Sequence, residues 1–97
     1  MPDESKLRRD AETGERARRL VEDPLLASLF DQLEAGYVRH WTFRTAVDDT
    51  AGRERLWQAV QIITRVREHL KILAADGRLA ETQLAELAQG ALVKPRA

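Results

Sequence analysis

The side chains that could do chemistry are few in this sequence, and their spacing does not form a catalytic or metal site. The two histidines, His40 and His69, have no cysteine partner, because the chain has no cysteine, and they do not form an HExxH-type pair. Asp48 and Asp49 precede an expected helix, where carboxylates cap the helix and favour its dipole. No phosphate-binding glycine loop and no nucleophile motif occurs. We therefore expect no enzyme activity, no metal and no cofactor.

Charge is high but balanced. The chain has 16 basic and 16 acidic side chains, whereas a protein that binds nucleic acid usually carries a basic excess on one face. The candidate phosphate contacts are five arginines near the N-terminus: Arg8, Arg9, Arg16, Arg18 and Arg19. The sequence therefore allows nucleic acid as a partner without favouring it.

Nothing in the sequence indicates a membrane or a secreted protein. The first ten residues are mostly charged and lack the apolar core of a signal peptide. No apolar run approaches the roughly 20 residues that a membrane helix needs. The lack of cysteine fits a reducing compartment. We expect a cytoplasmic protein, or a virion protein if the chain is encoded by a phage.

The spacing of apolar residues predicts one all-α domain over residues 1–97. Asp23 and Pro24 form a strong helix start, followed by an amphipathic helix over about 24–46. Gly36 lies on its apolar face, either as a tolerated glycine or as a point where another helix comes close. The apolar stripe contains Leu25, Leu26, Leu29, Phe30, Leu33, Tyr37 and Trp41.

A second long helix is expected over about 51–75, with Asp49 or Thr50 as its cap. Its apolar stripe contains Leu56, Ala59, Val60, Ile63, Val66, Leu70, Leu73 and Ala74. Within it the spacing of Leu56, Val60, Ile63, Arg67, Leu70 and Ala74 is close to a heptad seam. Asp76 and Gly77 predict its end, with Gly77 in the left-handed conformation. A short helix over 80–89 and a frayed tail over 90–97 follow. Residues 1–22 are expected to form a marginal helix or a mobile arm that orders on a partner.

The connection between the two long helices is short, so we expect them to form an antiparallel hairpin. In that register Arg67 faces Asp31. Arg67 either lays its aliphatic stem over the stripe with its charge in water, or forms an ion pair that fixes the register.

Each apolar stripe spans more arc than one partner helix can bury. An uncovered strip containing Phe30, Tyr37, Ile63 and Leu70 is therefore expected, and it predicts a homo-oligomer, most simply a dimer of two hairpins. Trp57 and Ile72 lie on the polar arc, where they either pack under the terminal helices or contact another subunit. The predicted interface residues are Phe30, Leu33, Tyr37, Trp41, Trp57, Ile63 and Leu70.

Three stretches, Asp23–Leu26, Phe30–Ala35 and Asp49–Trp57, resemble small helical proteins of tailed bacteriophages and prophages. Such proteins are often encoded beside DNA-packaging and capsid genes, and the resemblance covers roughly residues 15–80. The layout is also similar to the oligomerisation core of small terminase subunits. Those proteins usually add a basic DNA-binding element, which residues 1–22 lack.

These observations favour a non-catalytic assembly or protein–protein interaction module that binds itself, another protein, or both. The alternative is a DNA-packaging subunit, similar to a small terminase, that binds nucleic acid through the N-terminal arginines. A third option is a small inhibitor of a host enzyme.

Overall fold

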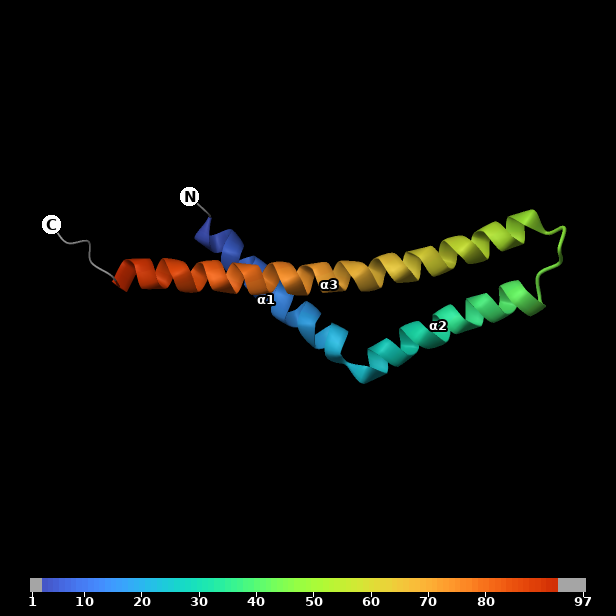
Figure 1. Cartoon of the computed structure of the whole chain (residues 1–97), viewed down its shortest axis with the longest axis horizontal. Helices are drawn as coiled ribbons and strands as arrows, with labels where there is room; N and C mark the ends of the chain where they lie inside the picture. The colour runs from blue at the N-terminus through green and yellow to red at the C-terminus, as the bar shows by residue number, and fades with distance from the viewer. Residues whose placement is uncertain (1–2, 93–97) are drawn as a thin grey trace. The chain divides into compact units, whose positions relative to one another are not determined.

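The computed structural model describes residues 3–92, which form three helices: α1 (Glu4–Glu22), α2 (Pro24–Phe43) and α3 (Thr50–Leu92). Contacts group the chain into two compact units. One unit contains α1 and the part of α3 that begins at Leu70. The other, residues 21–69, contains α2 and the N-terminal part of α3, which run antiparallel as a hairpin (Figure 1). The all-α class and the long helical hairpin are therefore confirmed.

The helix starts follow the capping residues of the sequence. Asp23 accepts hydrogen bonds from the backbone amides of Leu25, at 2.8 Å, and Leu26, at 3.3 Å, and Pro24 occupies the first helical position. Asp49 caps α3 in the same way, because its carboxylate accepts a hydrogen bond from the amide of Gly52 at 2.9 Å. These bonds satisfy amides that have no partner inside the helix.

Helix α3 does not end at Gly77, so the predicted end near residue 75 and the separate helix over 80–89 are wrong. The helix continues for 43 residues to Leu92, and Gly77 has no positive φ. Of the predicted tail, residues 90–92 belong to α3, whereas residues 93–97 lie outside the described part. A glycine costs about 1 kcal/mol in a helix relative to alanine, so another contact must offset this cost at Gly77.

That contact is a close crossing of α1 and α3 at two glycines. A Cβ atom at Gly14 would meet the Cα atom of Gly77 and would lie 2.9 Å from the carbonyl oxygen of Leu73. The buried residues around this crossing are small or aliphatic: Leu7, Gly14, Ala17, Ala74, Gly77 and Ala80. Residues 4–22 thus form a helix that packs on α3, which confirms the helix alternative of the prediction for these residues.

Gly36 behaves differently from Gly14. A Cβ atom added to Gly36 would meet nothing within 4 Å. None of the three described helices therefore approaches α2 closely at that position.

Candidate protein interaction surface

The titratable residues do not gather into a site for chemistry. His40 and His69 are both exposed, and the nearest polar partner recorded for His40 is the Thr45 hydroxyl, 3.4 Å from its Nδ1 atom. No group of three or more metal-ligating side chains occurs among the described residues. Asp49 is occupied with capping α3. No helix within residues 3–92 has both the length and the apolar character needed to cross a membrane.

Helix α2 carries many large apolar side chains, yet none of its residues is buried. The side chains nearest α3 are only partly covered, as Leu26, Phe30 and Tyr37 show. A second row of side chains lies about a quarter of a turn around α2 from these three residues, counted at 100° per residue. This row is not covered by helix α3. It contains Leu25, which is 68 % exposed, Leu29, and Leu33, which is 51 % exposed. Half of the apolar arc of α2 therefore has no partner among residues 3–92.

An ion pair and a groove show which side chains of α3 share a face with this row. The ion pair of Asp31 with Arg67 and the groove that Val38 and Trp57 both line lie on the other side of the hairpin. In the helical geometry of α3, Ile62 and Val66 lie on the opposite side from Arg67 and Trp57. Both are exposed. They therefore extend the apolar row of α2 into one surface, here called the leucine face, formed by Leu25, Leu29, Leu33, Ile62 and Val66.

The ion pair fixes the register of the hairpin. The Nη1 atom of Arg67 lies 2.8 Å from the Oδ1 atom of Asp31 and 3.9 Å from a carboxylate oxygen of Glu34. The guanidinium also lies 5.5 Å from the centre of the Phe30 ring, a cation–π distance. The predicted pairing of Arg67 with Asp31 is confirmed, and Arg67 covers the apolar seam while it pairs. Because the Asp31 side chain is largely exposed, the pair contributes more to register than to stability.

A small apolar groove lies near the turn on the face opposite the leucine face. It encloses about 210 Å³ and has no polar lining. Trp41 and Trp57, which the sequence predicted as interface residues, are both exposed beside it. The groove is lined by Tyr37, Val38, Trp41, Leu56, Trp57 and Val60.

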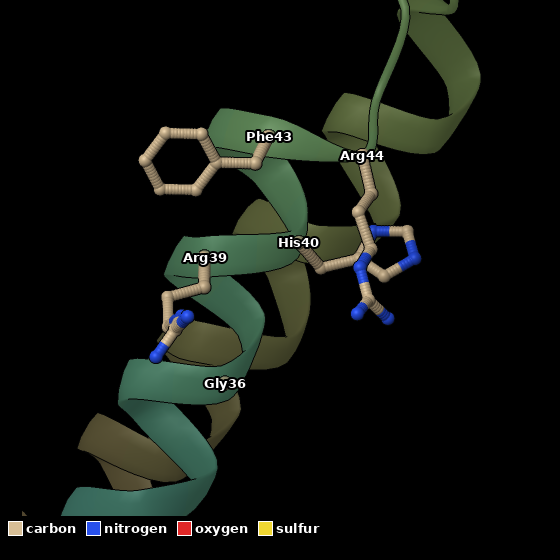
Figure 2. Close-up of a pocket in the computed structure, with 5 residues that line it drawn as sticks. All are labelled: Gly36, Arg39, His40, Phe43 and Arg44. Carbon is tan, nitrogen blue, oxygen red and sulfur yellow. The ribbon is translucent and has the colours of Figure 1, made fainter.

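A second hollow lies on α2 itself, at the turn end of the leucine face. It is lined by Gly36, Arg39, His40, Phe43 and Arg44, all from one helix and its C-terminal cap (Figure 2). In Figure 2 the Phe43 ring points to one side of the helix, and the His40 and Arg44 side chains lie together on the other side. Gly36 leaves the floor of the hollow without a side chain. The basic groups sit at the helix C-terminus, where they complement the helix dipole.

The N-terminal arginines are mostly engaged with carboxylates of their own helix. Arg18 binds Glu15 through two nitrogens, at 2.6 and 3.0 Å, Arg19 reaches the same carboxylate at 3.3 Å, and Arg8 pairs with Glu4 at 3.1 Å. The hydrogen bond from Arg18 is the main cause that lowers the pKa of Glu15. Nucleic-acid contact by Arg8, Arg9, Arg16, Arg18 and Arg19 stays a prediction.

The predicted interface residues divide into three groups by exposure. Ile63 is only 8 % exposed, so the expectation that it lies in an uncovered strip is wrong. Phe30, Tyr37 and Leu70 are partly covered. Leu33, Trp41 and Trp57 are exposed, and for them a role at an interface stays a prediction.

The sequence-based list missed Leu25, Leu29, Ile62 and Val66, although each pair has the four-residue spacing of one helix face. Ile72, which the sequence placed either under a terminal helix or at a subunit contact, is exposed.

Comparison of the chain with protein-family models, with curated proteins and with solved structures gave no match. The exposed apolar surface of the hairpin is therefore the main basis for a function.

Proposed function

We propose that this protein is a non-catalytic assembly module that binds another protein chain through the leucine face. The observation that carries the proposal is that α2, a helix rich in leucine and aromatic residues, has no buried residue. A row of large apolar side chains in water costs about 1 kcal/mol or more for each side chain that stays half exposed. Contiguous apolar surface of this kind normally marks a binding surface.

The composition of the face supports protein binding rather than chemistry. Its five side chains are all aliphatic. The ion pairs of the hairpin, including that of Arg67 with Asp31, lie on the other side. A flat aliphatic surface with a polar rim is typical of helix–helix interfaces.

The biological setting stays a prediction. The resemblance to phage and prophage proteins implies a part in virion assembly or DNA packaging, in the host cytoplasm or in the virion. We propose the assembly role because the leucine face supports it, whereas no described feature singles out DNA packaging or inhibition of a host enzyme.

The proposal is tested by substituting one face residue and one matched residue elsewhere. Leu33→Glu charges the face, and Leu79→Glu charges an equally exposed leucine of the other unit, which is 58 % exposed. Each chain carries a tag, is expressed at native abundance in the natural host, and is purified together with the proteins bound to it. A bound untagged copy of the same chain counts as a bound protein. We expect wild type and Leu79→Glu to retain the same bound protein, and Leu33→Glu to lose it. Equal retention by both variants contradicts the proposal.

A further inference from the structure

We infer that the partner of the leucine face is a second copy of this chain, bound so that the two hairpin turns lie at opposite ends of the dimer. The inference rests on the proposed function, because it names the occupant of the face that the proposal assigns to protein binding. The two-fold axis passes between positions 33 and 36 of the two α2 helices. Leu33 of each copy then packs over Gly36 of the other.

The shape of α2 fits this pairing. Gly36 has open space above it, so a leucine of a second copy can approach the backbone there. The same axis places Leu29 opposite His40 and Leu25 opposite Arg44, next to Phe43. The leucines at the start of α2 in one copy thus enter the hollow at the end of α2 in the other (Figure 2). This is the knob-into-hole packing of antiparallel helices.

Helix α3 is compatible with the same axis. The ion pair of Arg67 with Asp31 sets the register, so that Gly36 lies level with Ile62, and Leu33 lies level with Arg65, next to Val66. An axis that brings Leu33 of one copy onto Gly36 of the other therefore also brings Ile62 of one copy close to Val66 of the other. Large side chains meet on both helices without a shift of register.

The charges along α2 select the orientation with the turns apart. The start of the helix is flanked by two acids, Glu22 and Asp23, whereas its end and cap carry two arginines, Arg39 and Arg44. Antiparallel pairing of two α2 helices puts the basic end of each beside the acidic end of the other. A dimer with both hairpin turns at the same end would instead bring Arg44 of one copy near Arg55 of the other. Like charges at an interface are unfavourable.

The area of the face suits a weak but specific dimer. Twenty residues of α2 span about 30 Å, and two adjacent helices about 10 Å apart make a face about 20 Å wide. Each copy then buries about 600 Å², or about 1,200 Å² in total, which is the lower end for stable interfaces. We therefore expect association at micromolar concentrations.

The test uses single-cysteine chains of the purified full-length protein, which has no native cysteine. Leu33→Cys mixed with Gly36→Cys is oxidised in parallel with Leu33→Cys mixed with Val66→Cys. One variant of each mixture carries a mass tag, so that a disulfide between the two different variants is told apart from one between identical chains. We expect the disulfide between different variants in the first mixture and not in the second, because only the first pair meets across the proposed axis. Leu29→Cys with His40→Cys is a second pair that must also cross-link, and circular dichroism checks that each variant is helical.

The other outcomes identify which claim is wrong. Cross-linking of Leu33→Cys with Val66→Cys alone means that the turns lie at the same end, which overturns the orientation. If no pair cross-links and the purified wild type is a monomer, the second copy is not the partner. If the tagged chain then still retains another protein and Leu33→Glu loses it, the proposed function holds with a different partner. If the tagged chain retains no protein, the proposed function is wrong as well.

Discussion

The substitution Gly14→Ala tests the packing of α1 most sharply. It should lower the free energy of unfolding if the glycine crossing forms, and raise it if the crossing does not form. In an isolated helix, alanine in place of glycine stabilises by about 0.8–1 kcal/mol. At this crossing the new Cβ atom would lie 2.9 Å from the carbonyl oxygen of Leu73 and closer still to the Cα atom of Gly77. Both neighbours are backbone atoms, so neither can rotate away and the two helices must separate. Overpacking of this kind costs about 1–3 kcal/mol.

Gly90→Ala is the matched control, because a Cβ atom there meets nothing within 4 Å. The control therefore reports helix propensity alone, and the difference between the two variants isolates the clash. We expect Gly14→Ala to be less stable than Gly90→Ala by about 1–3 kcal/mol, measured by urea denaturation followed by circular dichroism. In thermal melts each kcal/mol corresponds to about 4–8 °C for a domain of this size. A Gly14→Ala variant as stable as Gly90→Ala would refute the close crossing.

Three further experiments test the local contacts. Glu15→Gln should reduce the loss of stability in acid, because the hydrogen bond from Arg18 lowers the pKa of Glu15 below 4.5 in the folded protein. The stability that ionised Glu15 contributes is therefore present above pH 4.5 and is lost as the pH falls through the lowered pKa. Thermal melts across this pH range measure the effect, and identical pH profiles for the variant and the wild type contradict it. A double-mutant cycle of Asp31→Asn and Arg67→Met should give a coupling of about 0.2–1 kcal/mol, as exposed pairs do, and zero coupling would show that the ion pair is not formed. Asp23→Ala should cost about 1 kcal/mol through loss of the α2 cap, whereas Asp48→Ala should stay within about 0.5 kcal/mol of wild type; equal denaturation midpoints for the two variants argue against the cap.

Local signals in the sequence predicted the hairpin well. The proline and aspartate that begin α2, the cap of α3 and the pairing of Arg67 with Asp31 all depend on residues close in sequence or on a short turn. A capping side chain acts on amides two or three residues away, so the sequence shows both partners. The length of a short turn likewise sets which residues face each other along an antiparallel pair.

Contacts between residues far apart in sequence explain what the sequence did not reveal. Asp76 and Gly77 have the local composition of a helix end, and only the distant Gly14 makes the helix continue. The small residues Ala74, Gly77 and Ala80 at seam spacing were the available signal for that crossing.

The sequence also did not reveal which residues of the α2 stripe stay uncovered, because this depends on contacts with α3. Periodicity gives the width of an apolar stripe but not the rotation of the helix about its own axis. The structure turns Phe30 and Tyr37 toward α3 and leaves Leu25, Leu29 and Leu33 outside. Two helices alone cannot cover an arc of that width, so the prediction of an uncovered strip was right in kind and wrong in its residues.

The most direct test of the central claim is the mass of the purified chain in sedimentation equilibrium across the micromolar range. We predict that wild type and Leu79→Glu reach twice the chain mass of 11.0 kDa as concentration rises, while Leu33→Glu stays at 11.0 kDa and remains helical. Leu33 is half exposed in the single chain, so its substitution should disturb association more than folding. A wild-type chain that stays at 11.0 kDa at high micromolar concentration would contradict self-association through the leucine face.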